Sequence, residues 1–124
     1  MKILCVDDDP GVLEMVKAVL ESEKHEILAA AGGAQGLELF RQHGKTLGGV
    51  FLDLRMPGLT GLDLIREIRK TSTVPVVAVS AYLDKVTIGE CEKAGFTGFI
   101  HKPFDVNQLL SVASNLFGGN AKNR

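Results

Sequence analysis

Five short runs of apolar residues recur along the chain, and longer stretches of mixed polarity separate them. Each run is almost uninterrupted, which is typical of strands in a parallel sheet that is covered on both faces. The runs predict strands at residues 2–6, 26–30, 49–52, 74–79 and 99–101.

The stretches between the runs carry apolar residues every three or four positions, which indicates helices with one buried face. Each stretch has such a set: Val16 and Leu20, Leu37 and Phe40, Ile65 and Ile68, Cys91 and Ala94, and Leu109 and Ala113. The fourth stretch is the weakest, because Gly89 lies inside it. Residues typical of helix starts and ends support the division: Asp9 with Pro10, Thr60 with Asp63, Asp105 with Gln108, Gly44 and Gly95.

This strict alternation of five strands and five helices predicts one α/β domain. Strand, helix and next parallel strand form a right-handed crossover, so the repeats build a doubly wound sheet with helices on both faces. A length of 124 residues, 45% hydrophobic and 23% charged, fits a single globular domain. We expect this domain at residues 1–117 and a flexible tail or linker stub, polar and glycine-rich, at 118–124.

The charge balance offers no electrostatic reason to expect binding to nucleic acid or to an anionic membrane. Fourteen basic and fifteen acidic residues leave a net charge of −1. No apolar run approaches the roughly 18 residues of a membrane span, and no leader pattern precedes the first run, so a cytoplasmic protein is expected. The two cysteines, Cys5 and Cys91, lie in apolar patterns without a metal-site spacing and are predicted to be buried free thiols.

Polar residues collect where the predicted strands end. Asp7, Asp8 and Asp9 follow the first strand, Asp53 the third, Ser80 the fourth and Lys102 the fifth. The carboxyl ends of parallel strands meet at one crevice of such a sheet, so these side chains are expected to converge. Each has a plainer interpretation alone: helix capping for the aspartates, most of all Asp9, a turn hydroxyl for Ser80, and a solvated amine for Lys102.

Together, the residues at the strand ends predict a site for phosphoryl transfer to a carboxylate. Asp7 and Asp8 repel Asp53 at short range, and such an arrangement usually persists only when a cation neutralises it. Three carboxylates favour Mg²⁺, which prefers oxygen ligands. A hydroxyl and an ammonium complete the groups that such a transfer needs.

Four motifs in this order resemble the receiver domains of two-component response regulators over nearly the whole chain. They are Val6-Asp7-Asp8-Asp9-Pro10, Asp53-Leu54-Arg55-Met56-Pro57 followed by Gly61, Val79-Ser80-Ala81, and Lys102-Pro103-Phe104. Each is short, but all four at these positions make the resemblance specific. It implies a flavodoxin-like fold with strand order 2-1-3-4-5.

The resemblance also implies a role for each residue of the motifs. Asp53 would accept a phosphoryl group from a phosphohistidine on a sensor histidine kinase or a histidine phosphotransfer protein. Asp7, Asp8, Asp53 and the backbone carbonyl of Arg55 would hold Mg²⁺. The phosphoryl oxygens would be bound by Ser80, the amide of Ala81, and Lys102. Such a domain catalyses its own phosphorylation and slow dephosphorylation, and is a signalling phosphoacceptor, not a conventional enzyme.

The same resemblance implies a conformational switch. The Ser80 hydroxyl would move toward the phosphoryl group, Phe99 would turn inward, and the surface of the fourth helix, fifth strand and fifth helix would change. Phe99 has no hydroxyl, where the family often has Tyr, and a plain core residue is the other interpretation. No charge occurs between Asp105 and Lys122, so the dimer of winged-helix members, which pairs charges there, is not expected. The downstream effector or attached output domain is unknown.

Two further side chains border the expected path of water to the phosphoryl group. Arg55 lies two residues after Asp53, and Tyr82 lies two residues after Ser80. In the resembling family these positions modulate self-hydrolysis. A cation–π contact between them would partly cover the phosphoryl group and exclude water, whereas the alternative is that both point to solvent.

Two other classes share part of this pattern. A phosphohydrolase of the haloacid dehalogenase type would use Asp7 as nucleophile and Asp9 as acid and base. That class needs further carboxylates after the lysine, where only Asp105 follows, and a Thr or Val where Gly11 stands. A flavodoxin-like FMN module needs a hydroxyl-rich phosphate loop after the first strand, and the three aspartates there would repel a phosphate.

Overall fold

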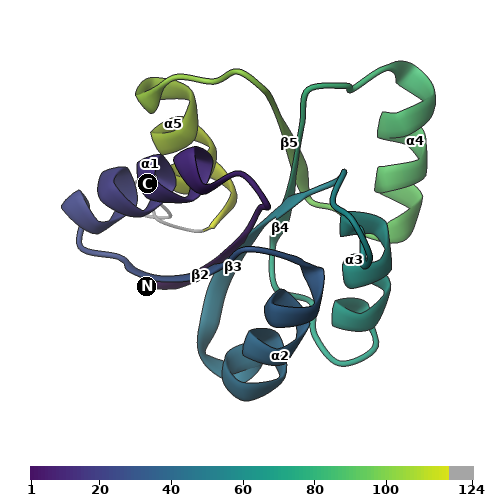
Figure 1. The fold of residues 1–124 in the computed structure, drawn as a ribbon, viewed down its shortest axis with the longest axis horizontal. Coiled ribbons are helices and arrows are strands. Elements are labelled where there is room, and N and C mark those ends of the chain that lie inside the picture. The colour runs from purple at the N-terminus through teal and green to yellow at the C-terminus, as the bar shows by residue number, and fades with distance from the viewer. Residues whose placement is uncertain (118–124) are drawn as a thin grey trace.

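The computed structural model describes residues 1–117, and the predicted tail at 118–124 lies outside the described residues. A five-stranded parallel sheet has the order β2-β1-β3-β4-β5, with helices on both faces (Figure 1). The doubly wound α/β fold is therefore confirmed. The elements are β1 (Lys2–Val6), α1 (Pro10–Ser22), β2 (Glu26–Ala30), α2 (Gly33–His43), a short 3₁₀ turn (Gly44–Thr46), β3 (Leu47–Asp53), α3 (Gly61–Arg69), β4 (Val76–Ser80), α4 (Lys85–Ala94), β5 (Gly98–His101) and α5 (Val106–Leu116).

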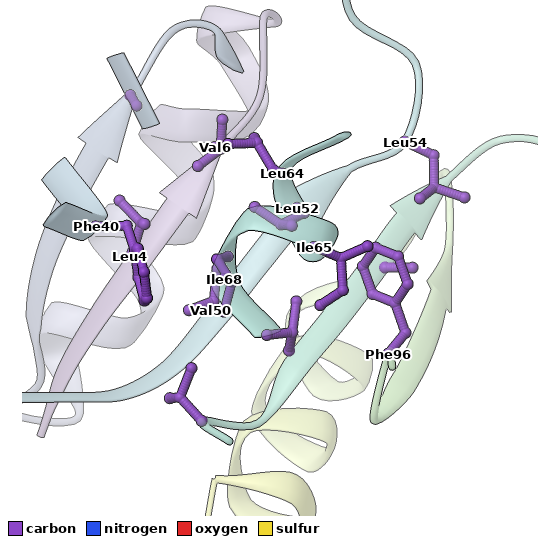
Figure 2. Close-up of a cluster of buried hydrophobic side chains, with 14 of the residues drawn as sticks. Leu4, Val6, Phe40, Val50, Leu52, Leu54, Leu64, Ile65, Ile68 and Phe96 are labelled. Carbon is purple, nitrogen blue, oxygen red and sulfur yellow. The ribbon is translucent and has the colours of Figure 1, made fainter. Parts of the chain in front are cut away.

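Two hydrophobic clusters, one on each face, cover the sheet. Leu4 and Val6 of β1 belong to the cluster under α2, α3 and α4 (Figure 2). Ile3 and Cys5 of the same strand belong to the cluster under α1 and α5. This alternation follows from the strand geometry, which points successive side chains to opposite faces. Burial on both faces explains why the strands appear as continuous apolar runs.

Three strands differ in their boundaries from the sequence prediction. β3 begins earlier, at Leu47, and includes Asp53, while β5 begins one residue earlier, at Gly98. β4 runs from Val76 to Ser80 instead of residues 74–79. Pro75 explains the late start, because it has no N–H to continue a ladder. The corrected ends make Asp53 and Ser80 the last residues of their strands.

Helix ends agree with the capping residues predicted from the sequence. The Asp9 carboxylate accepts a hydrogen bond from the Gly11 N–H at the start of α1, and reciprocal capping boxes begin α3 and α5. Gly95 ends α4 in the left-handed region, with φ of 110°. The sequence analysis missed the cap of α4, where Asp84 accepts a 2.8 Å hydrogen bond from the Thr87 N–H.

Other expectations from the sequence concern single residues and the membrane. Both Cys5 and Cys91 are buried and free, as predicted. Among residues 1–117, no helix has the length and apolar character needed to span a bilayer.

Two glycine-to-alanine substitutions are expected to have opposite effects on stability. A Cβ at Gly61, the first residue of α3, would lie 2.6 Å from the carbonyl oxygen of Asp53. Gly61→Ala should therefore lower the free energy of unfolding by about 1–3 kcal/mol. A Cβ at Gly89 meets no atom within 4 Å, so Gly89→Ala should raise it by about 0.5–1 kcal/mol through helix propensity. Urea unfolding of both variants checks the pair, and equal effects would contradict the close approach at Gly61.

Candidate functional site

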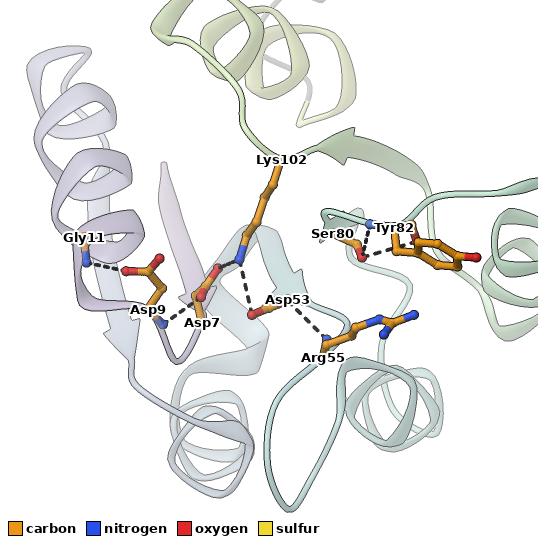
Figure 3. A network of polar contacts seen from close by, with 8 residues as sticks. All are labelled: Asp7, Asp9, Gly11, Asp53, Arg55, Ser80, Tyr82 and Lys102. Carbon is orange, nitrogen blue, oxygen red and sulfur yellow. Dashed lines mark hydrogen bonds and ion pairs between the residues drawn. The ribbon is translucent and has the colours of Figure 1, made fainter.

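The predicted polar residues converge at the carboxyl ends of the strands (Figure 3). Asp7 directly follows β1, Asp53 ends β3, and their side chains come together with that of Asp8. One carboxylate oxygen from each of the three lies within 4.8 Å of the others. Asp7 and Asp53 are buried, at 1% and 4% exposure, whereas Asp8 is exposed. The structure thus forms the carboxylate cluster that the sequence predicts.

Asp9 does not join this cluster. Its Oδ1 accepts the Gly11 N–H at 2.9 Å, and its own N–H donates to Asp7 Oδ1 at 2.9 Å. The helix-capping interpretation of Asp9 is therefore correct, and its contribution to the site is to hold Asp7 in place.

Among the described residues, Lys102 is the only basic residue whose side chain pairs with the carboxylate cluster. Its Nζ lies 3.0 Å from Asp7 Oδ2 and 3.4 Å from Asp53 Oδ2. Its backbone N–H donates to the Ser80 carbonyl at 2.8 Å, which fixes the start of the loop after β5. Burial disfavours the ammonium, but the hydrogen bonds and charges of Asp7 and Asp53 outweigh burial and raise the pKa of Lys102.

Ionising Asp53 is costly in this environment. Burial and the nearby Asp7 carboxylate raise the pKa of Asp53 to about 6, although the Arg55 N–H and the Lys102 ammonium favour the charged form. The Arg55 N–H donates to Asp53 Oδ1 at 3.2 Å. At neutral pH the carboxylate is thus held charged at a free-energy cost, which an additional cation would reduce.

The cluster fits Mg²⁺ by its donors and its charge. All three groups offer carboxylate oxygens, the ligand type that Mg²⁺ prefers. When all are ionised, three negative charges face the single positive charge of Lys102, which leaves a charge of −2 for a divalent cation to balance. Asp8 is exposed and lies at the open side of the cluster, so water can complete the coordination.

The hydroxyl of Ser80 is buried and already engaged. Its Oγ accepts the Tyr82 N–H at 3.0 Å and donates to the Tyr82 carbonyl at 3.4 Å (Figure 3). In this state Ser80 is the turn hydroxyl that its position alone suggests. Ala81 next to it is exposed, and Phe99 is half-buried against the cluster under α2, α3 and α4.

Arg55 and Tyr82 make the predicted cation–π contact. The guanidinium carbon lies 4.9 Å from the centroid of the ring, and Tyr82 is 54% exposed. Figure 3 shows both side chains on the same side of Asp53 as Ser80. The contact joins the loop after β3 to the loop after β4, and both residues remain exposed to solvent.

The sequence analysis missed a cavity of about 310 Å³ beside Lys102. Its lining is mostly apolar: Asp9, Val12, Met15, Ala81, Lys102, Pro103 and Phe104. Val12 and Met15 follow the ordinary spacing of a core-facing helix, so nothing in the sequence marks them as part of a surface hollow. Lys102, whose ammonium contacts the carboxylates, is thus also part of the cavity wall.

Comparisons with known proteins identify the same family as the four motifs. The family model described as "Response regulator receiver domain" matches residues 3–114. The DNA-binding response regulator MtrA of Mycolicibacterium smegmatis is 36% identical over 110 residues, which are 89% of this chain and 47% of that protein. The transcriptional regulatory protein CseB of Streptomyces avermitilis is 37% identical over 109 residues, 88% of this chain and 46% of that protein. The chain thus spans about half the length of these curated relatives.

Solved structures agree in fold. A receiver domain protein from Clostridium thermocellum superposes with a TM-score of 0.86 at 32% identity, covering 98% of this chain and 97% of that one. The chemotaxis protein CheY4 of Vibrio cholerae gives a TM-score of 0.88 at 25% identity, covering 93% and 97%. The similarity extends over nearly the whole of both chains.

Proposed function

Because the chain belongs to the response regulator receiver domain family, we propose that Asp53 is its phosphorylation site and that residues 1–117 form the receiver unit. Receiver domains are signalling phosphoacceptors, and phosphoryl acceptance is their general function. The observation that carries the proposal is the position of Asp53 between Asp7 and Lys102 at the strand ends. The donor would be a phosphohistidine on a sensor histidine kinase or a phosphotransfer protein.

In the proposed reaction, a carboxylate oxygen of Asp53 attacks the phosphorus, and the bond between phosphorus and the histidine nitrogen breaks. Lys102, already 3.4 Å from Asp53, would bind a phosphoryl oxygen with its ammonium. The Ser80 hydroxyl and the Ala81 amide would bind the others. These groups act by position and charge, which dominate phosphoryl transfer.

Receiver domains bind Mg²⁺ at an acidic pocket, and this chain has a matching cluster. We propose Asp7, Asp8, Asp53 and the backbone carbonyl of Arg55 as its protein ligands. Bound there, magnesium would supply the positive charge that offsets the phosphoryl oxygens as they approach Asp53. The buried pair, Asp7 and Asp53, is held in place by hydrogen bonds from the N–H groups of Asp9 and Arg55.

The proposed switch begins at Ser80. To reach a phosphoryl group, its hydroxyl must give up both hydrogen bonds to the Tyr82 backbone. Phe99 would then turn inward, and the surface formed by α4, β5 and α5 would change. The half-buried position of Phe99 supports this role, because an inward turn would remove more of its apolar ring from water.

Membership of the family indicates the classes of partner, a sensor kinase and an output domain, but not the individual proteins. Response regulators pair with sensor kinases and carry output domains, and we propose such a kinase as donor and an effector or attached output domain as receiver of the signal. We assign no nucleic-acid or membrane contact to this unit, because its net charge is −1. The cytoplasm is the proposed location. α5 carries no charged side chain, which argues against dimers that pair charges there.

Acid-labile labelling tests the proposal. Incubation with acetyl phosphate and Mg²⁺ should attach one phosphoryl group, and peptide mapping should locate it on Asp53. A phosphohydrolase of the haloacid dehalogenase type would instead be labelled on Asp7. Labelling on Asp7, or none with a cognate kinase and acetyl phosphate alike, would overturn the proposed function.

The stack of Arg55 on Tyr82 is expected to slow the loss of phosphate. The two side chains meet on the side of Asp53 where Ser80 lies, and there they would exclude the water that attacks the phosphorus. The double variant Arg55→Ala with Tyr82→Ala should lose phosphate about 3- to 10-fold faster, with nearly unchanged Mg²⁺ affinity. Phosphate-release kinetics check this. Arg66→Ala, an exposed arginine of α3, is the matched control and should decay as the wild type does; unchanged decay in the double variant would exclude a shielding role.

A further inference from the structure

The two ends of α4 are held very differently. The helix lies at the edge of the molecule, beyond α3 (Figure 1), and Cys91 is its one buried residue. In its first half, Val86 is 71% exposed and a Cβ at Gly89 would meet no atom within 4 Å. Few buried contacts hold this half, so local opening there costs little.

The C-terminal end is bound by Arg69, the last residue of α3. Its Nε and Nη2 donate to the Gly95 carbonyl at 3.0 and 2.8 Å, and its Nη1 donates to the Ser72 carbonyl at 3.2 Å. Phe96, directly after the helix cap, is buried at 6% exposure. One guanidinium thus ties the end of α4 to the end of α3 and to the loop before β4.

Arg69 makes these bonds without a carboxylate partner among the described residues. Burial lowers its pKa, and no charged group offsets that effect. Two of the three bonds go to the Gly95 carbonyl at the C-terminal end of α4, which carries the partial negative charge of the helix dipole. The planar guanidinium presents several donors in a fixed geometry, which a lysine cannot reproduce.

Gly95 allows this contact in two ways. Its φ of 110° favours glycine, and a Cβ there would lie 3.0 Å from Arg69 Nε. The backbone of the helix end can therefore approach the guanidinium closely. The C-terminal end of α4 is therefore fixed by hydrogen bonds, whereas the rest of the helix has few buried contacts.

The weakly held end is the one connected to the phosphorylation site. The Ser80 hydroxyl binds the Tyr82 backbone, and Asp84 two residues later caps the first turn of α4 through the Thr87 N–H. A movement of Ser80 is thus passed along four residues of chain to the start of the helix. The Arg69 end lies at the opposite end of the helix.

We propose that Arg69 anchors the C-terminal end of α4, so that the change on phosphorylation is a movement of the N-terminal half, residues 85–90, about the fixed Gly95. This inference rests on the proposed function for the event that starts the movement. The anchor itself is a property of the unphosphorylated protein. Arg69, which lies outside the phosphorylation site, would thus determine which end of α4 moves.

Amide hydrogen exchange measured by NMR tests the anchor, with beryllofluoride and Mg²⁺ as the acyl-phosphate mimic. The Ile88 N–H bonds within the first half of α4, and the Phe96 N–H bonds to the Cys91 carbonyl at the anchored end. In the resting protein the Phe96 amide should exchange at least about 10-fold more slowly than that of Ile88. Beryllofluoride should change the rate at Ile88 and leave Phe96 unchanged.

Arg69→Lys keeps the positive charge but removes the planar guanidinium, whose three nitrogens donate to the Gly95 and Ser72 carbonyls. Exchange at Phe96 should then rise at least about 10-fold, and the effect of beryllofluoride should extend to it. Arg66→Lys is the matched control, because that exposed arginine of α3 pairs only loosely with Asp63, at 3.8 Å, and both amides should behave as in the wild type. The Val50 amide, which donates to the Pro75 carbonyl, reports global unfolding.

Three results would overturn the anchor: an unchanged Phe96 rate in Arg69→Lys, a rise at Phe96 no larger than that at Val50, or a wild-type response to beryllofluoride that is equal at Ile88 and Phe96. Failure of beryllofluoride to bind, seen as a missing bound ¹⁹F signal, would instead count against the proposed function. The comparison of Arg69→Lys with the wild type in the resting protein would still decide whether Arg69 fixes the helix end.

Discussion

Replacing Asp53 with asparagine is expected to abolish phosphorylation of this chain. The amide has nearly the shape of the carboxylate but lacks the charged oxygen that attacks phosphorus. Labelling by acetyl phosphate with Mg²⁺ should fall at least about a thousandfold, measured as acid-labile phosphate by intact mass. Undiminished or acid-stable labelling in Asp53→Asn would mean that phosphorylation occurs elsewhere.

Asp9→Asn is the matched control for this experiment. The same chemical change is made at the residue directly after Asp8, at a side chain that caps α1 and lies outside the carboxylate cluster. Asparagine caps helices about as well as aspartate, so both folding and labelling should persist. A loss of labelling in Asp9→Asn equal to that in Asp53→Asn would show that any change near the strand ends disrupts the site, and Asp53 would lose its special role.

Much of the site is predictable because it depends on topology. Parallel strands end at one edge of the sheet, so residues directly after them meet whatever the exact side-chain packing is. Asp7, Asp53 and Lys102 therefore appear together in the structure as the sequence predicts. Helix caps are predictable because they are local: the capping box of α3 needs only Thr60 and Asp63, which are three positions apart in the sequence.

Features that depend on distant partners could not be predicted. The late start of β4 reflects Pro75, whose carbonyl accepts the Val50 N–H although the residue itself lies outside the ladder. The bonds of Arg69 to Gly95 require the ends of two helices to be adjacent, and the residues are 26 positions apart. The choice of Ser80 between the Tyr82 backbone and a ligand is likewise a matter of competing contacts, which residue spacing does not reveal.

Replacing Lys102 with methionine is expected to destabilise the metal-free protein most at high pH. The substitution leaves the buried carboxylates of Asp7 and Asp53 without their ammonium partner. Removing one partner of a buried ion pair typically costs about 3–5 kcal/mol, and we expect about 3 kcal/mol at pH 8. Urea unfolding without divalent cations measures the loss, and Lys17→Met, an exposed lysine of α1, should change stability by less than about 0.5 kcal/mol.

The pH dependence separates charge from packing. The pKa of Asp53 is raised to about 6, so the Asp53 carboxyl group binds its proton more tightly in the folded protein than in the unfolded chain. Its contribution to stability is therefore fully present below about pH 4, the ordinary range of an aspartate, and is lost as the pH rises through 6. Without the Lys102 ammonium the pKa of Asp53 should rise further, so the loss in Lys102→Met should continue above pH 6 and shrink markedly at pH 5.

Magnesium ions should restore more stability to Lys102→Met than to the wild type at pH 8, which lies above the pKa of about 6 of Asp53 in the wild type. A cation that binds only the folded protein stabilises it by mass action. Without the Lys102 ammonium, the carboxylate cluster carries one more uncompensated negative charge and should attract the cation more strongly. If the loss in Lys102→Met were the same at pH 5 and pH 8 and insensitive to magnesium, the lysine stem would be acting by packing. The ammonium would then not be what holds Asp7 and Asp53 together, and the electrostatic account of the site would fail.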